Sequence, residues 1–251
     1  MIAFDMTFLL IAIPAVMFAG ISKAGFGSGA AFAAAAVMAL VVPPGVALGV
    51  MLPLLMVIDA VSLRPYWRRW DAPSARHIII GAAPGVALGA VIYAMVNADS
   101  FRLMIGLVCI AFVGWQWGRG RGIIRVGHFG FARPWAWVTG LAAGFTSFVS
   151  HAGGPPVAVF LLGQGMPKTT YQATTVFVFW AINLLKFGPY AYLGIFTADT
   201  ALADLVLAPF AVLGAWLGVR AHHWVSDRVF FGLTYVLLLA TGVRLLWVAL
   251  T

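Results

Sequence analysis

Residues 20–30 read GISKAGFGSGA and separate two apolar runs, MTFLLIAIPAVMFA at 6–19 and AFAAAAVMALVV at 31–42. The stretch holds four glycines, two serines and one lysine, Lys23. A charged side chain between such flanks is costly unless it reaches water, a partner or a ligand. What surrounds Lys23 therefore decides which fold this sequence can form.

The composition indicates a protein that lies in a lipid bilayer. The chain is 63% hydrophobic and only 9% charged, whereas soluble domains carry about 25% charged residues. Long apolar runs recur over the whole length, which is typical of a polytopic membrane protein. The formal net charge of +8 comes mainly from arginines between these runs. That distribution is the positive-inside pattern and does not indicate nucleic-acid binding.

Two other features of the sequence argue against a disulfide framework and against a signal peptide. Cys109 is the only cysteine and lies in an apolar run, so no disulfide framework is expected. Residues 1–5 contain Asp5 and no basic residue, and further apolar runs follow. The first run is therefore interpreted as a membrane segment and not as a signal peptide.

Ten apolar segments are expected to be helical. Crossing roughly 30 Å of hydrocarbon at about 1.5 Å per residue takes roughly 20 residues. The second segment would extend only about 21 Å and the seventh only about 15 Å, so each is expected to be the return arm of a hairpin that dips into the membrane. The sequence leaves open whether these two segments are re-entrant or spanning. The ten segments are 6–22, 29–42, 45–63, 77–96, 101–118, 135–150, 155–164, 171–188, 200–219 and 228–249.

The two halves of the chain resemble each other, and their loops differ in charge. PGVALGA at 84–90 returns as PFAVLGA at 209–215, and Asp59 matches Asn183 at nearly the same offset. The loop after the third segment is basic, whereas its counterpart in the second half has two aspartates and no base. Because basic loops lie in the cytoplasm, equivalent loops would lie on opposite sides of the membrane. An odd number of segments in each half produces such an inverted repeat.

We therefore predict an all-α polytopic membrane protein with a single transmembrane domain over residues 1–251. It would consist of repeat 1 at 5–118, a cytoplasmic basic linker at 119–134 and repeat 2 at 135–250. Each inverted repeat would hold about five helical segments and open with a glycine-rich broken-helix hairpin. One hairpin would enter from outside and the other from the cytoplasm, so that their tips meet near the midplane.

The two tips carry residues that suit an anion. Glycines in the first tip permit sharp turns and close approach of a ligand, and Ser28 would cap the helix that follows. In the second tip, prolines at 155–156 would open the next helix. Two helix N-termini and the ammonium group of Lys23 would then face a shared anion. The predicted substrate-binding residues are Lys23, Gly25, Gly27, Ser28, Gly29, Ser150, His151, Gly153, Gly154 and Asn183, with no catalytic residue, metal or cofactor.

Other interpretations of these residues stay open at this point. Glycines in membrane helices often mark close helix packing, Lys23 could snorkel to the cytoplasmic face, and His151 could be a packed or capping residue. Asp59 is expected to form a local ion pair with the adjacent arginine-rich loop. Lys186 is expected at the interface near the outer end of its helix, with Asn183, one turn earlier, facing inward.

Four stretches resemble the sulfite exporter TauE/SafE family, and together they extend the similarity over nearly the whole chain. The most specific parts are SKAGFG and HAGGPP. The resemblance implies a secondary transporter that moves sulfite or small organosulfonates, often out of the bacterial cytoplasm, and it implies no set of catalytic residues. The stretches are GISKAGFGSG at 20–29, LPLLMVIDAVSLRPYWRRWD at 52–71, GFTSFVSHAGGPPVAVFLLGQGMPKTT at 144–170 and NLLKFGPYAYLG at 183–194.

The residues and the resemblance together predict a secondary transporter, not an enzyme, that exports a small sulfur-containing anion across the bacterial inner membrane. Its partners would be sulfite or a sulfonate and the lipid bilayer, with no nucleic acid and with the oligomeric state left open. One alternative is a passive anion channel. Another is an intramembrane serine hydrolase that uses Ser28 and His151, although Phe26 interrupts the G-x-S-G pattern of rhomboid proteases.

Two further expectations depend on an unpaired Lys23. Every acidic residue is an aspartate near a loop or a helix end, so no carboxylate relay is expected at the tips. The membrane potential alone would then drive export, with His151 as the proton carrier if one exists. Lys23→Ala is expected to abolish anion binding and to leave folding intact, because it would remove an unpaired buried charge.

Overall fold

The computed structural model describes residues 6–26, 31–124, 130–221 and 227–251. The predicted tip residues Gly27, Ser28 and Gly29 lie outside the described residues. Within the described part the regular structure is entirely helical, which confirms the predicted all-helical class. The elements are α1 Met6–Ile21, η1 Ser22–Phe26, α2 Phe32–Met38, α3 Pro44–Leu63, η2 Arg64–Tyr66, α4 Ala72–Met95, α5 Ala98–Gly120, α6 Arg133–Ser150, α7 Gly154–Gly163, α8 Lys168–Tyr192, α9 Ala198–Ala221 and α10 Asp227–Leu250.

Several helices begin where the local sequence supplies a cap. Asp71 accepts a hydrogen bond from the backbone N–H of Ser74 at 2.9 Å, and Asn97 accepts one from the N–H of Ser100 at 2.8 Å. Each side chain satisfies one of the free N–H groups of a helix start, of α4 and α5 respectively. Proline stands in the first turn of α3, α6 and α7, where its missing N–H costs nothing.

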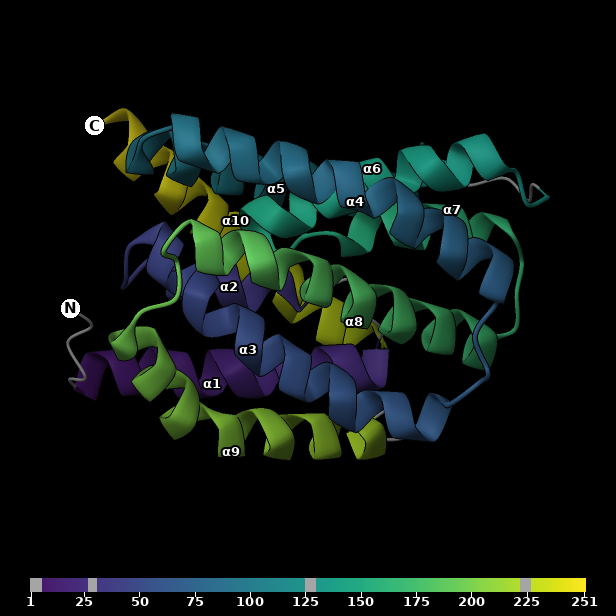
Figure 1. Ribbon diagram of the computed structural model, residues 1–251, viewed down its shortest axis with the longest axis horizontal. Coiled ribbons are helices and arrows are strands. Elements are labelled where there is room, and N and C mark those ends of the chain that lie inside the picture. The colour runs from purple at the N-terminus through teal and green to yellow at the C-terminus, as the bar shows by residue number, and fades with distance from the viewer. Residues whose placement is uncertain (1–5, 27–30, 125–129, 222–226) are drawn as a thin grey trace.

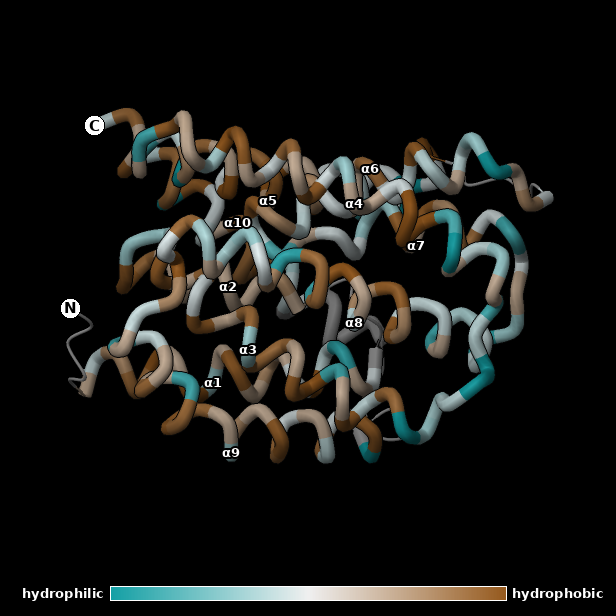
Figure 2. The backbone as a smooth tube through the Cα atoms, viewed as in Figure 1, coloured by the Kyte–Doolittle hydropathy of each residue, from teal (hydrophilic) through white to brown (hydrophobic). Residues whose placement is uncertain are grey.

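The lengths and hydropathies of the helices fit a multi-pass membrane protein. Among the described residues, five helical stretches are long and apolar enough to cross a membrane: Met6–Gly25, Pro44–Tyr66, Ala72–Met95, Ala98–Gly120 and Ala198–Arg220. The second and seventh predicted segments are short helices, α2 with seven residues and α7 with ten. In Figure 2 the hydrophilic positions gather toward the ends of the bundle, and most of its length is hydrophobic.

The helices pack across the two halves of the chain. In Figure 1, α1 lies beside α9, and α4 crosses α6 on the other side of the molecule. In addition, α3 packs against α8, and α5 packs against α10. The first helix of each predicted repeat thus packs on the fourth helix of the other. The start of α1 and the end of α10 lie at one end of the molecule, and the connections after α3 and before α8 lie at the opposite end (Figure 1).

Two glycines allow the cross-half pairs to approach closely. A Cβ atom on Gly20 of α1 would lie 2.6 Å from the backbone nitrogen of Ala215 in α9. A Cβ atom on Gly144 of α6 would lie 2.9 Å from the Cα atom of Ala82 in α4. The backbones therefore touch, which is the small-residue packing common in membrane helices.

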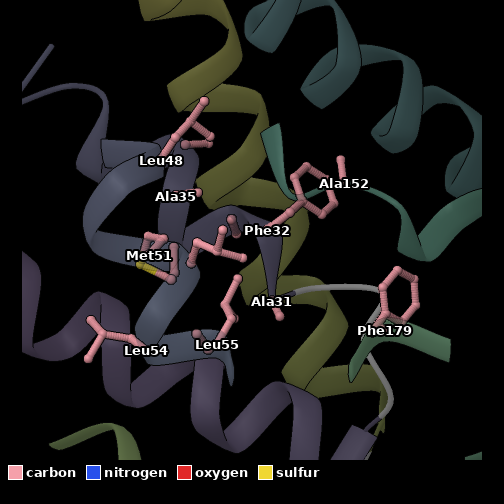
Figure 3. Close-up of a cluster of buried hydrophobic side chains, with 14 of the residues drawn as sticks. Ala31, Phe32, Ala35, Leu48, Met51, Leu54, Leu55, Ala152 and Phe179 are labelled. Atoms are coloured by element: carbon pink, nitrogen blue, oxygen red, sulfur yellow. The ribbon is translucent and has the colours of Figure 1, made fainter. Parts of the chain in front are cut away.

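The short helix α2 lies in the centre of the core. Six of its seven residues are buried, namely its phenylalanine, its four alanines and Met38. The helix is therefore apolar on every side. Phe32, which is fully buried, extends its ring toward Ala152, and Phe179 of α8 lies on the same side of the cluster (Figure 3). Leu48, Met51 and Leu55 of α3 form the opposite side of this cluster (Figure 3). The apolar cluster holds α2, α3 and α8 together around the polar residues described below.

The loop charges predict the membrane topology. In a Cys109→Ala background, single cysteines are placed at the exposed positions Ala72, Gly130, Ala98 and Ala198. We expect a membrane-impermeant maleimide to label Ala98→Cys and Ala198→Cys on intact cells. Ala72→Cys and Gly130→Cys should be labelled only after permeabilisation, because basic loops stay in the cytoplasm. Labelling of Ala72→Cys and Ala198→Cys from the same side would mean that the two halves are not inverted.

Candidate functional site

Lys23 does not face an empty anion site, because it is paired with a carboxylate. Lys23 lies in η1, a π-helical turn that continues α1, and such turns recur at functional sites. Its ammonium nitrogen lies 2.5 Å from Oδ1 of Asp59 in α3. The two side chains are 4% and 0% exposed, so the pair is shielded from water. Gln172 of α8 donates a hydrogen bond to the backbone carbonyl of Lys23 at 2.9 Å and fixes this turn.

The second oxygen of Asp59 connects the two halves of the chain. Asn183 of α8 donates a hydrogen bond from Nδ2 to Oδ2 of Asp59 at 2.7 Å, and both side chains are buried. These two residues are the pair that the internal sequence match aligned. Both carboxylate oxygens of Asp59 are thereby engaged, one by an ammonium group and one by an amide.

A second buried lysine lies on the other side of this network. Lys186, one turn after Asn183 in α8, is 0% exposed. It donates a hydrogen bond to the carbonyl oxygen of Ser147 at 3.2 Å, and its nitrogen lies 2.8 Å from Nδ1 of His151. The roles of the two nitrogens depend on the tautomer of His151: with Lys186 protonated, Nδ1 accepts and the ring proton lies on Nε2. Tyr190 closes this side by donating to the carbonyl oxygen of Phe148 at 2.8 Å.

The backbone holds His151 in an unusual conformation. His151 follows the last residue of α6 with φ of +57°, the left-handed region that glycine normally occupies. Its N–H bonds the carbonyl of Ser147 at 2.9 Å. The ring is buried, and its Nε2 lies toward the backbone of Leu48 without a hydrogen bond of ordinary geometry among the described residues.

The two networks share one small cavity. Lys23, Asn183, Ser147 and His151 line a cavity of about 10 Å³ together with Ala31, Leu55 and Phe179, three residues that also border the apolar cluster in Figure 3. Lys186 is within electrostatic range of both Lys23 and Asp59. With both lysines protonated, the site holds two ammonium groups and one carboxylate. We call Lys23, Asp59, Asn183, Lys186 and His151 the buried charge cluster.

The other described residues of the predicted site lie near this cluster, but their contacts are with helix backbones and apolar side chains. Ser150 is buried but donates to the carbonyl of Thr146 at 3.2 Å, within its own helix. Gly153 packs beside Phe179, and Gly154 begins α7. Gly25 lies so close to the backbone of Gly218 in α9 that a Cβ atom would collide with it. For Gly25 the close-packing interpretation therefore fits, and α2, with seven residues, is too short to supply a strong helix dipole.

The expectations from the sequence for Asp59 and for Lys186 are both wrong. Asp59 is not paired with the arginine-rich loop, because it turns inward to Lys23 and Asn183. Lys186 is not interfacial, because α8 continues for six more residues and buries it completely. Because Asp59 pairs with Lys23, the expectation that no carboxylate lies at the tips is also wrong. The alignment of Asp59 with Asn183 was the signal that could have placed Asp59 inside, since an intramembrane charge is functional by default.

A larger cavity lies beside η1 and was not foreseen from the sequence. It has a volume of about 710 Å³, and its lining includes Tyr66, Trp115, Arg119, Lys168 and Tyr171. The guanidinium of Arg119 lies 5.1 Å from the ring centre of Trp115, and no carboxylate within the described ranges pairs with it. We call this space the basic vestibule.

The basic vestibule reaches from the basic end of the molecule to the turn that carries Lys23. Tyr66 belongs to η2, Arg119 to the last turn of α5, and Lys168 begins α8. Gln172, which donates to the carbonyl of Lys23, also lines this cavity. The vestibule thus extends from the arginine-rich end to η1, and its lining includes no residue of the buried charge cluster.

Removing Lys23 should now destabilise the protein, contrary to the expectation for an unpaired lysine. Lys23→Met leaves the carboxylate of Asp59 buried without its cation, and we expect a loss of about 3–5 kcal/mol in the free energy of unfolding. The double variant Lys23→Met/Asp59→Asn should recover most of that loss, because no charge remains and Asn183 keeps an acceptor. Unfolding midpoints of the purified proteins in detergent measure both. A single variant as stable as the wild type would contradict the buried pair.

The comparisons with known proteins agree with the resemblance read from the sequence. The family model described as sulfite exporter TauE/SafE matches residues 12–245, nearly the whole chain. Comparison with curated proteins and with solved structures found no match. The matched region contains every described residue of the buried charge cluster and of the basic vestibule. The chain is therefore a member of the sulfite exporter TauE/SafE family, whose members are membrane transporters of sulfur anions.

Proposed function

We propose that this protein is a secondary transporter that exports sulfite or a small organosulfonate across the bacterial inner membrane. The observation that carries the proposal is the buried charge cluster, in which Lys23 pairs with the single carboxylate and Lys186, bonded to His151, lies within electrostatic range of it. Buried charges in a membrane protein are expensive and mark substrate or ion pathways. An anion with three oxygens can accept hydrogen bonds from both ammonium groups, from Nε2 of His151 and from the amide of Asn183.

The basic vestibule supports binding from the cytoplasmic side. Arg119 and Lys168 add positive charge to a cavity of about 710 Å³, and a positively charged cleft raises the local concentration of anions. The aromatic lining from Tyr66, Trp115 and Tyr171 also suits the organic part of a sulfonate. Because the arginine-rich end is expected in the cytoplasm, the vestibule is a route by which a cytoplasmic anion approaches Lys23.

The packing of the helices supports two inverted repeats, at 5–118 and 135–250, joined by the basic linker at 119–134. α1 packs on α9 as α6 packs on α4, and the aligned residues Asp59 and Asn183 contact each other. In transporters built this way, substrate sites lie where the repeats meet, and broken helices form them. Lys23 in η1 and His151 at the end of α6 stand at such interruptions.

Neither alternative function is favoured by the described residues. A passive channel needs a continuous path, whereas the cavity at the cluster measures only about 10 Å³, which is about the space for one water molecule. A serine hydrolase needs a serine that bonds its histidine. The described partner of the His151 side chain is Lys186, and Ser28 lies outside the described residues.

The proposal is tested by anion transport into proteoliposomes and by binding to the purified protein. We expect sulfite, thiosulfate or 2-hydroxyethanesulfonate to be bound and transported, and chloride and sulfate to be poor substrates. Lys186→Met should weaken binding at least about tenfold, because it removes a charge-assisted hydrogen bond. Arg244→Gln is the matched control, because Arg244 is exposed on α10. Equal loss in both variants, or no transport of any sulfur anion by the wild type, would contradict the proposal.

The basic vestibule predicts a kinetic effect that depends on salt. Arg119→Gln should raise the half-saturating substrate concentration severalfold at low ionic strength and change the maximal rate little, because Arg119 attracts the anion without holding it in the cluster. The difference should shrink as salt is added. Arg121→Gln is the control, since Arg121 is exposed and stacks on Trp117 outside the cavity. A maximal rate that falls with an unchanged half-saturating concentration would assign Arg119 another role.

A further inference from the structure

The carboxylate of Asp59 occupies the place that a substrate anion would take. Its Oδ1 lies 2.5 Å from the ammonium nitrogen of Lys23, and its Oδ2 accepts the hydrogen bond of Asn183 at 2.7 Å. Lys23 and Asn183 are two of the donors that the proposed function assigns to the substrate. The protein without substrate therefore satisfies these donors with an anion of its own.

No space remains for a second anion beside the intact pair. The cavity bounded by Lys23, Asn183, Ser147 and His151 measures about 10 Å³, which holds at most a water molecule. An oxyanion that reaches Lys23 must therefore separate it from Asp59. Binding of the anion and pairing of Lys23 with Asp59 exclude each other.

A separated Asp59 would be left in surroundings that do not tolerate its charge. The charged or titratable groups that face it are Lys23 from η1 and, from α8, Lys186, whose own hydrogen bonds go to Ser147 and His151. His151, at the end of α6, faces both lysines. Once the substrate holds both ammonium groups, the carboxylate keeps only one N–H of the Asn183 amide, whose other N–H can go to the substrate. A buried carboxylate without a cation is strongly disfavoured. Taking up a proton removes the charge and turns one oxygen into a hydrogen-bond donor.

We propose that binding of the substrate anion at Lys23 is coupled to uptake of one proton by Asp59, so that the protein carries one proton with each anion. The inference rests on the proposed function and adds the coupled ion to it. The proton joins a carboxylate oxygen of Asp59 to give the neutral acid, while the anion takes over the ammonium group. Transport of a monoanion with one proton moves no net charge, so the membrane potential does not act on it. Export is then driven by the outward gradient of the anion and is opposed by an inward proton gradient.

Proton uptake can be counted with anions that do not themselves bind protons near neutral pH. We use 2-hydroxyethanesulfonate and thiosulfate as probes and titrate the purified full-length protein by calorimetry in two buffers of different ionisation enthalpy. The wild type should take up about one proton per anion bound, and its affinity should fall about tenfold per pH unit where Asp59 is ionised in the free protein. Binding without proton uptake overturns the inference but leaves the proposed function standing. Failure of both probes and of sulfite to bind overturns both.

The variant Asp59→Asn distinguishes proton uptake by Asp59 from proton uptake by another group. The amide keeps the hydrogen bond with Asn183 but cannot compete for Lys23 as an anion or take up a proton. The variant should bind 2-hydroxyethanesulfonate more tightly than the wild type at neutral pH and without proton uptake. In proteoliposomes its flux should respond to an imposed potential, whereas wild-type flux should respond to a pH gradient. Proton uptake that persists in Asp59→Asn and disappears in His151→Gln assigns the proton to His151 and overturns the role of Asp59.

A measurement on the wild type alone decides the question should Asp59→Asn fail to fold. Anion-induced infrared difference spectra report the carbonyl band of a protonated carboxylic acid directly. We expect this band to appear when 2-hydroxyethanesulfonate binds and to shift in heavy water. If anion binding produces no protonated-carboxyl band, Asp59 stays ionised and the inference is wrong.

Discussion

A lysine buried in a membrane protein needs a negative charge within a few ångströms, and Asp59 meets this need for Lys23. The requirement fixes three elements at once, because the pair joins η1 to α3 and the amide of Asn183 adds α8. The apolar residues around α2 then exclude water from the pair. The positions of the vestibule and of the second lysine follow from this arrangement, since both adjoin the turn or the helix that the pair holds.

Much of the architecture could be predicted because the thickness of the bilayer sets how many residues a helix needs to span it. The ten segments, the two short helices and the helical class all follow from apolar run lengths, and the resemblance to the TauE/SafE family agrees with the family match. The direction in which a side chain points is a different matter. Asp59 stands five residues before Arg64 in the chain, but it faces the interior while Arg64 is exposed. On a helix, neighbours in sequence can face opposite surroundings.

The sequence also does not show how deeply a charged side chain is buried in the protein. The sequence predicts an interfacial Lys186 because the predicted segment 171–188 ends two residues after it. The helix instead passes through Pro189 and ends at Tyr192, which moves Lys186 toward the core. The vestibule could not be foreseen either, because its lining comes from η1, η2, α5, α7, α8 and α10. Such a surface is defined by how helices pack and not by a motif.

The packing of α1 on α9 has a consequence for how the protein is made. Helices leave the ribosome in chain order, and α1 enters the membrane long before its partner α9 has been synthesised. Until then its glycine-lined face, with Gly20 at the contact, meets only lipid or an insertion factor. Lys23 follows directly after this face, and its partner Asp59 arrives with α3, well before α9. Early formation of the ion pair would retain the first hairpin in the membrane while the second half is still being translated.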